Sequence, residues 1–321
     1  MIVRWGIGEL GAVLRELDVV RPFVFASPRF DVLPLEPYGR WSELPTDRIA
    51  AAAAAATDAD VLVALGGGST IDTGKAVSAE TGLSLVSIPT TYAGAEWTPF
   101  YGIRDPDRRM RGGGAGANLA AIVYEPELSL HLPRSETVGT ALNALAHCAE
   151  ALYVTARNDE ADRHALAGTS LIGTWLPRVV RGEGDRLEGR TELLRGACEA
   201  GAALGKSMLG LGHAMAQALG GRYGLPHGAM NALCLPPALR FNEPSASIEI
   251  SRFAEALGTD DPAARVEELA RLGGFERLRD FGVPEAELGE VAEAVVTRAG
   301  AKANPRPATA AEVLELLRSI W

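Results

Sequence analysis

Asn143, His147, His213 and His227 are the residues whose types and spacing could do chemistry. Asn143 and His147 lie four apart in LNALAHCAEA, which puts them on one face of a helix. His213 and His227 lie fourteen apart, but glycines and a proline interrupt the chain between them, so they need not share a helix. Any one of these histidines alone would more often be a core or surface residue than a ligand.

These four residues could together hold a divalent metal ion such as iron or zinc, because imidazole nitrogens and an amide oxygen are suitable ligands. However, the set lacks the carboxylate that would offset the charge of the metal. On chemistry alone we therefore expect no bound metal. If an ion were present, these four residues would be its ligands.

A glycine turn in the first half of the chain could bind an anion. Residues 61–65 form an apolar run of the length of a buried strand, Gly66, Gly67 and Gly68 follow, and residues 70–80 are predicted to form a helix that begins near Ser69. Glycines let the backbone approach a phosphate, and the helix N-terminus favours negative charge. The alternative is a tight turn without a ligand. The pattern is neither GxGxxG nor a Walker loop, since no Lys-Ser/Thr pair follows the glycines.

The composition restricts the partners. The chain has 321 residues, of which 47% are hydrophobic and 22% charged, as in an ordinary globular enzyme. The net charge of -10 argues against nucleic acid or an anionic membrane as a partner. The N-terminal residues lack a signal-peptide pattern, no apolar run is long enough to span a membrane, and the three scattered cysteines fit reduced thiols. We expect a cytoplasmic protein.

Strands and helices are predicted to alternate in the first 133 residues. Strands are expected at 21–26, 61–65, 83–88 and 118–124, helices at 8–17, 47–56 and 70–80, and a loop at 31–46. This order predicts an α/β domain with a parallel sheet. Ligands of such sheets bind beyond the carboxyl ends of the strands, where residues 66–69 and 89–91 would lie.

From residue 134 to 321 we predict a second domain made of helices. The expected helices are 137–156, 160–181, 190–206, 213–218, one from 228 onward, 246–256, 263–272, 285–299 and 309–320.

Five segments together resemble maleylacetate reductase, a branch of the iron-containing (group III) alcohol dehydrogenases with a dehydroquinate-synthase-like fold. They are GGGST at residues 66–70, IPTTYAGAE at 88–96, LNALAHCAEALY at 142–153, ALGGRYGLPHG at 218–228 and ANPRP at 303–307. The resemblance runs from about residue 61 to the end of the sequence. It implies an N-terminal nucleotide-binding domain, a helical C-terminal domain, a cleft between them as the active site, and a homodimer.

The resemblance also implies roles for individual residues. Gly66, Gly67, Gly68 and Ser69 match the loop that holds the pyrophosphate of NAD(H) or NADP(H). Thr90, Thr91 and Tyr92 match the segment beside the nicotinamide, and Asp72 and Lys75 match polar positions of the following helix. Four residues match the metal-ligand positions of the superfamily, where the first is normally aspartate: Asn143, His147, His213 and His227. Maleylacetate reductases carry asparagine there and are thought to work without a metal, so the histidines would bind a substrate carboxylate and polarise the ketone or alkene.

Two positions depart from the family pattern. Gln217 stands four residues after His213, where the family has a second histidine that is expected to shuttle protons. Glutamine cannot donate a proton at neutral pH, so this work would fall to His213, His227, His147 or Tyr92. The chain is also short around residues 28–60, where the family places another helix and strand against the adenosine half of the cofactor. Residues 28–45 are predicted to be a loop.

We therefore expect an NAD(P)H-dependent reductase of a small, acidic, unsaturated keto acid, as in aromatic catabolism. The alternative is a repurposed member of the family. It would perform non-redox acid–base chemistry, such as isomerisation, dehydration, cyclisation or condensation, in a biosynthetic pathway with weakened or lost cofactor binding. A third reading is a binding subunit without activity, against which the three retained histidines argue. The choice between NAD and NADP stays open.

Overall fold

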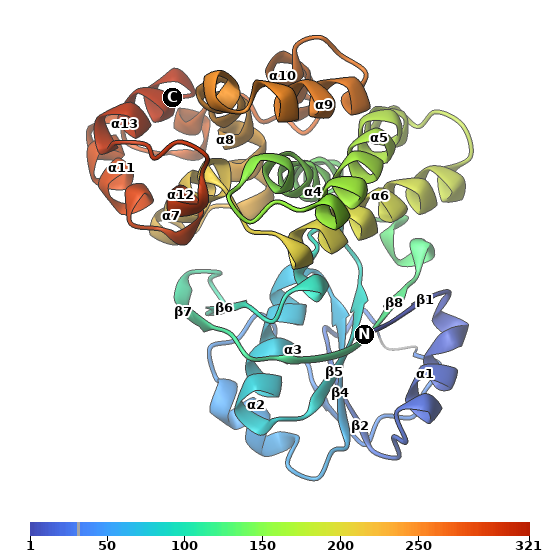
Figure 1. The fold of residues 1–321 in the computed structure, drawn as a ribbon. Coiled ribbons are helices and arrows are strands. Elements are labelled where there is room, and N and C mark those ends of the chain that lie inside the picture. The colour runs from blue at the N-terminus through green and yellow to red at the C-terminus, as the bar shows by residue number, and fades with distance from the viewer. Residues whose placement is uncertain (31–32) are drawn as a thin grey trace. The chain divides into compact units, whose positions relative to one another are not determined.

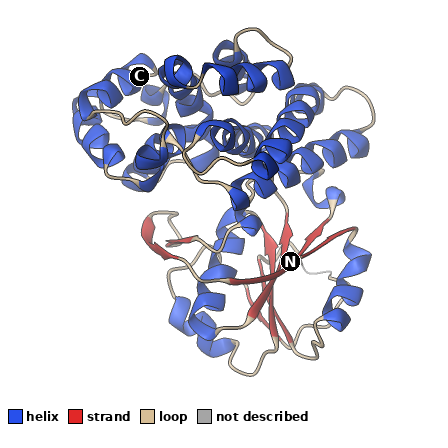
Figure 2. Cartoon of the chain, viewed as in Figure 1, coloured by secondary structure: helices blue, strands red, loops and turns tan. Residues whose placement is uncertain are grey.

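The computed structural model describes residues 1–30 and 33–321, and its chain divides into two compact units. The N-terminal unit comprises residues 1–91 and 95–131, and the helical unit comprises residues 92–94 and 132–321. Figures 1 and 2 show the strands in the first and helices alone in the second.

The N-terminal unit is built on a parallel sheet of six strands in the order β1-β8-β5-β4-β2-β3. Its strands are β1 (Ile2–Trp5), β2 (Pro22–Ala26), β3 (Gly39–Trp41), β4 (Val61–Gly66), β5 (Ser84–Pro89) and β8 (Asn118–Tyr124). Its helices are α1 (Leu10–Glu16), α2 (Ile49–Ala55) and α3 (Gly68–Thr81). The predicted α/β fold with a parallel sheet is confirmed.

The sheet is covered on both faces because β2 and β4 are unbroken runs without a polar side chain. Phe23, Phe25 and Leu62 pack with α2 and α3, whereas Val24 and Val63, which alternate with them, pack with α1. Successive side chains of a strand point to opposite faces, so an unbroken apolar run has both faces buried.

The direction in which successive strands are added across the sheet reverses after β3. From β2 the chain runs outward to the edge strand β3, and α2 then returns it to β4 on the other side of β2. Open α/β sheets bind their ligands outside the carboxyl ends of the strands at such a reversal. Here β4 leads directly into the glycine turn and α3 (Figure 1).

The structure differs from the prediction in three short strands. β3 lies within the predicted loops 31–46 and 28–45, so the prediction of a loop is wrong for these three residues. β1 was not predicted, because four residues give too short a pattern. β6 (Tyr101–Arg104) and β7 (Met110–Gly114) form an antiparallel pair where the sequence indicated only a glycine-rich segment. Asp31 and Val32, at the start of the predicted loop, lie outside the described residues.

The helical unit is arranged around α4 (Arg134–Tyr153), which packs against α5, α6 and α8 (Figure 1). From Thr137 to Tyr153 nearly every residue of α4 is buried, since its sequence is apolar or small on all sides. The other helices are α5 (Asp159–Arg181), α6 (Arg186–Lys206), α7 (Leu211–Tyr223), α8 (His227–Asn242), α9 (Ser247–Leu257), α10 (Pro262–Arg271), α11 (Leu288–Val296), α12 (Ala299–Ala303) and α13 (Ala310–Ser319).

The junction of α7 and α8 separates two of the candidate histidines. α7 continues past the predicted end at residue 218 and runs through two glycines to Tyr223. Gly224 then takes a left-handed conformation with φ 69°, which glycine adopts without strain, and Pro226 caps α8 at its first residue, His227. His213 and His227 therefore lie on different helices. The predicted helix 285–299 is also divided, into α11 and the start of α12.

None of the helices in the described part of the chain combines the length and the apolar character needed to cross a bilayer.

Candidate active site

The glycine turn joins β4 to α3 closely. Gly67 caps α3 with extended backbone, and its carbonyl accepts from the N–H groups of Thr70 and Ile71 at 3.0 and 3.2 Å. A Cβ on Gly66 would lie 2.5 Å from the Thr70 hydroxyl oxygen, so only glycine fits there without displacing that side chain. The N–H groups of the first turn of a helix have no intrahelical partner and remain available to an anion. Gly68 and Ser69 supply these groups.

Thr90 and Thr91 lie next to the turn. The N–H of Thr90 donates to the carbonyl of Gly66 at 3.0 Å, and a Cβ on Gly67 would lie 3.1 Å from the Thr91 methyl carbon. The hydroxyl of Thr90 is buried and has no hydrogen-bond partner among the described residues. A buried unpartnered hydroxyl is rare and is expected to find a partner in a ligand or water. The turn and Thr90 thus fit the pyrophosphate end of a dinucleotide.

Lys75 and Asp72 connect α3 to residues 95–102 of the N-terminal unit. The Lys75 ammonium, whose side chain is 1% exposed, donates to the carbonyls of Ala95 and Phe100 and pairs with Asp72 at 2.8 Å. The other oxygen of Asp72 accepts from the N–H of Gly102 at 3.2 Å. An ammonium has three donors, and all three are used. As placed, Lys75 has no donor left for a phosphate.

The candidate residues of α4 share one face with a glutamate. Asn143, His147 and Glu150 follow each other at spacings of four and three and are all buried. The backbone of Tyr92–Gly94 lies along this face. The Asn143 amide nitrogen donates to the carbonyl of Ala93 at 2.9 Å.

Glu150 holds His213 in place. Its carboxylate accepts from Nδ1 of His213 at 2.6 Å and from the N–H groups of His213 and Gly210 at 3.0 and 2.6 Å. The bond to Nδ1 fixes the ring, so that Nε2 faces Oδ1 of Asn143 at 3.3 Å. A carboxylate that orients an imidazole in this way is a common arrangement in active sites.

Asn231 links α8, which carries His227, to Asn143 on α4. Asn231 lies four residues after His227, and its amide nitrogen donates to Oδ1 of Asn143 at 2.7 Å and to Nε2 of His227 at 3.0 Å. Because Nε2 of His227 accepts this bond, the proton of the neutral ring is assigned to Nδ1. His227 is half-buried, whereas His213 is fully buried.

His147 completes the cluster. Its ring stacks on that of His213 with centroids 4.7 Å apart, and the rings of His213 and His227 lie 5.8 Å apart. Burial, and secondarily the neighbouring histidines, hold the pKa of His147 well below its usual range. Its buried Nδ1 has no partner in the described structure and lies beside Gly94. The three predicted histidines and Asn143 therefore form one cluster in the helical unit.

Two other predicted residues have different surroundings. Tyr92 is fully buried, and its hydroxyl accepts a hydrogen bond from Arg190 at 3.1 Å. Gln217 lies half-buried on α7, one turn after His213.

The four side chains that could hold a divalent cation are three imidazoles and an amide. Nδ1 of His213 is bonded to Glu150, which leaves Nε2 as the nitrogen of that ring that could bind an ion, and the ring of His147 stacks nearly parallel on it, at 14°. Asn143 supplies no negative charge. Across residues 1–30 and 33–321, no group of three or more His, Cys, Asp or Glu side chains could hold an ion.

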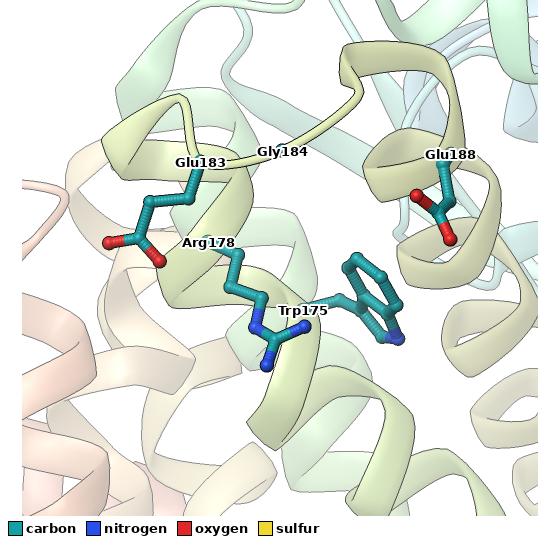
Figure 3. Close-up of a pocket in the computed structure, with 5 residues that line it drawn as sticks. All are labelled: Trp175, Arg178, Glu183, Gly184 and Glu188. Carbon is teal, nitrogen blue, oxygen red and sulfur yellow. The ribbon is translucent and has the colours of Figure 1, made fainter.

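Two surface hollows of the helical unit lie at other residues. One, of about 360 Å³, is lined by Trp175, Arg178, Glu183, Gly184 and Glu188. Figure 3 shows it at the end of α5 and the start of α6, with the Arg178 guanidinium 5.1 Å from the centre of the Trp175 ring. The other, of about 420 Å³, is lined by residues of α8 to α10 and their connections. Neither is lined by a candidate residue of the cluster.

Three polar residues of the site were not predicted from the sequence: Glu150, Asn231 and Arg190. Glu150 continues the face of Asn143 and His147, and Asn231 stands four residues after His227, as His147 stands four after Asn143. Helical spacing could have found both. Arg190 comes from α6 and has no local signal in the sequence.

Comparison with known proteins agrees with this architecture. Residues 41–123 match the model of the iron-containing alcohol dehydrogenase family, and residues 137–321 match the model of its C-terminal part. A maleylacetate reductase of Burkholderia cepacia is 39% identical over 250 residues, which are 78% of this chain and 70% of that protein. Maleylacetate reductase 2 of Cupriavidus pinatubonensis is 38% identical over 276 residues, 85% of this chain and 76% of that protein.

Solved structures are similar over the whole chain. An iron-containing alcohol dehydrogenase of Corynebacterium glutamicum superposes with a TM-score of 0.90 at 30% identity, covering 100% of this chain and 94% of the other. A maleylacetate reductase of Agrobacterium tumefaciens superposes with a TM-score of 0.89 at 29% identity, covering 100% and 95%.

The fold and these relatives define an oxidoreductase of an NAD(P)-dependent class. The chain belongs to the iron-containing alcohol dehydrogenase family, and it has maleylacetate reductases among its relatives. The resemblance seen in the sequence is confirmed.

Proposed function

We propose that the chain is an NAD(P)H-dependent reductase of a small unsaturated keto acid of the maleylacetate type, and that it works without a metal. The observation that carries the proposal is the amide of Asn143 in a cluster of three histidines. It supplies hydrogen bonds but no charge to balance a cation. The relatives named maleylacetate reductase support the substrate class.

The N-terminal unit would bind the dinucleotide and the helical unit would carry the catalytic residues. The turn at Gly66, Gly67, Gly68 and Ser69 would hold the pyrophosphate, and Thr90 would offer its buried hydroxyl. When bound, the reduced nicotinamide would supply a hydride to the substrate. Thr91 borders the turn and would help to shape this site. We propose a homodimer as the working form.

The histidines would bind the acidic substrate and stabilise the charge that develops on it. His227 is half-buried, and the Nδ1–H group of its neutral ring would donate a hydrogen bond to the substrate as the hydride is added, while the proton that completes the reduction would come from solvent. His213, oriented by Glu150, and neutral His147 would polarise the group that is reduced. Gln217 would at most donate a hydrogen bond.

The test combines binding, turnover and metal content. Calorimetric titration with NADH and NADPH should show binding of at least one. Oxidation of that cofactor with maleylacetate should survive a chelator, in protein that contains less than one metal ion per chain. His227→Gln should lower kcat by about 100-fold, whereas His131→Gln, which replaces an exposed histidine of the N-terminal unit, should leave it unchanged.

Three outcomes would overturn parts of the proposal. Loss of activity on chelation, restored by iron or zinc, would refute the metal-free mechanism. Binding of the cofactor without reduction of maleylacetate or any related keto acid would refute the substrate class. No binding of either cofactor by folded protein would refute hydride transfer and favour non-redox acid–base chemistry in the histidine cluster.

A further inference from the structure

Arg190 is a buried cation whose hydrogen-bond acceptors are all neutral. It is 7% exposed, and its guanidinium donates to the hydroxyls of Tyr92 and Thr137 at 3.1 and 2.8 Å and to the carbonyl of Leu132 at 3.3 Å. No carboxylate of the described residues forms an ion pair with it. Burying an unpaired charge is costly, so a neutral side chain would fill this place at lower cost. The position of Arg190 therefore suggests a role beyond packing.

The Tyr92–Gly94 segment connects Arg190 to the histidine cluster. The backbone of this segment runs along one face of α4. The N–H of Tyr92 lies 3.3 Å from the hydroxyl of Thr140, and the carbonyl of Ala93 accepts from Asn143 at 2.9 Å. A Cβ on Gly94 would lie 3.4 Å from Nδ1 of His147. Thr140, Asn143 and His147 follow each other at helical spacing, so a shift of the segment would be felt at all three.

The carbonyl of Ala93 decides which end of the Asn143 amide faces the histidines. With the amide nitrogen bound to Ala93, Oδ1 faces Nε2 of His213 and accepts from Asn231. Without that carbonyl the amide could rotate by half a turn and present N–H groups to both neighbours. This would break the bond from Asn231 and place an N–H group where Oδ1 now faces Nε2 of His213.

We propose that Arg190 is a positioning residue for the histidine cluster. It holds the hydroxyl of Tyr92, fixes the Tyr92–Gly94 segment on α4, and so sets the orientation of the Asn143 amide. Its effect on turnover rests on the proposed function. Its effect on the histidines does not.

The experiment reads the histidines directly by NMR of the imidazole nitrogens, which distinguishes tautomers and is practical in a chain with five histidines. The variants are Arg190→Gln, Tyr92→Phe and the double variant. The control is Arg195→Gln, which changes an exposed arginine of the same helix that pairs with Glu192. We expect the His213 and His147 signals to shift in both single variants and to stay in place in the control.

Turnover supplies the second readout. Each single variant should lower kcat by about tenfold while KM for the cofactor stays constant. The double variant should lose no more than the larger single loss, because both act along one chain of contacts. If Arg190→Gln fails to fold, Tyr92→Phe still tests the proposal, since it leaves the bonds of Arg190 to Thr137 and Leu132 in place.

Two results would overturn the proposal. Folded Arg190→Gln and Tyr92→Phe proteins with wild-type imidazole signals would show that Arg190 only stabilises the fold. Fully additive losses of kcat would show that Arg190 does not act through Tyr92. If wild-type protein reduces no keto acid, the proposed function fails, while the imidazole spectra still decide the role of Arg190.

Discussion

Asn143 is held at both ends of its amide, and this makes it a sensitive residue to change. In Asn143→Asp a carboxylate oxygen would replace the amide nitrogen that now donates to the carbonyl of Ala93 at 2.9 Å. Two oxygens without a proton between them repel, so we expect kcat to fall at least about tenfold and the melting temperature to drop. Kinetics and thermal unfolding, with and without added iron or zinc, would check this. A variant with unchanged kcat and melting temperature in the absence of metal would contradict it.

His147 should make stability depend on pH. Its pKa in the folded chain lies well below the value of about 6.5 expected in the unfolded chain, because of burial. The unfolded chain then binds a proton more readily, so the free energy of unfolding falls as the pH drops below about 6.5. His147→Gln lacks this contribution, and its curve should be shallower by up to about 1.4 kcal/mol per pH unit.

Urea unfolding between about pH 7 and pH 5 would measure this, with His131→Gln as the control variant. Parallel curves for wild type and His147→Gln would show that His147 does not stay neutral in the folded chain.

At this scale the sequence predicted the residue types better than their partners. The histidines and Asn143 stand out by type and spacing, and the structure brings them together. The pairing of Glu150 with His213 and of Arg190 with Tyr92 joins residues 63 and 98 positions apart in the chain. No local pattern encodes contacts of that separation.

In the N-terminal unit, one buried lysine of α3 holds a neighbouring segment of the chain in place. Lys75 ties α3 to the loop that carries Ala95 and Phe100, and it is almost completely buried. Lys75→Met would leave two carbonyls and Asp72 without their donor, so we expect a loss of about 2–4 kcal/mol in the free energy of unfolding. Chemical denaturation would measure it, with Lys302→Met, at an exposed lysine, as the control. Weaker cofactor binding at unchanged stability would instead indicate a direct contact with phosphate.

The turn between β4 and α3 should tolerate no side chain at its first glycine. A methyl group on Gly66 would collide with Thr70 in the first turn of α3. We therefore expect Gly66→Ala to weaken binding of NADH or NADPH by about tenfold or more, as 1.4 kcal/mol of misfit suffices for that. Gly11→Ala in α1 is the matched control, because its Cβ would approach only the flexible end of Arg15, at 3.5 Å. Calorimetric titration that gives equal affinities would contradict the expectation.

Elements with a strong local pattern could be predicted, and short edge strands could not. The apolar run before Gly66 and the strand Asn118–Tyr124 are long enough to be recognised from the sequence. β3 has only three residues and is half-buried, so its pattern is too short to separate it from a loop. β7 contains three consecutive glycines, and pairing with β6, not propensity, makes it a strand.

At the scale of the whole molecule, the helical unit is assembled from two separate pieces of chain. Tyr92–Gly94 belongs to it, while the residues on both sides of that segment belong to the N-terminal unit. A fragment of residues 132–321 would therefore leave Arg190 without Tyr92 and Asn143 without the carbonyl of Ala93.

We expect that fragment to unfold at a lower melting temperature than the helical unit within the whole chain. A synthetic peptide that spans residues 90–96 should raise the melting temperature of the fragment, and the same peptide with phenylalanine at position 92 should raise it less. Circular dichroism would measure both. A fragment as stable as the unit in the intact chain would show that the segment contributes little.

The division of the helical unit into two pieces also limits how this chain can exchange parts with a relative. A chimera that joins residues 1–131 of a relative to residues 132–321 of this chain would place another protein's residues, in place of Tyr92–Gly94, against Arg190 and Asn143. Such recombinants should work only when the tripeptide is inherited together with the helical unit. The three residues are thus the smallest portion of the N-terminal sequence that has to travel with the helical unit.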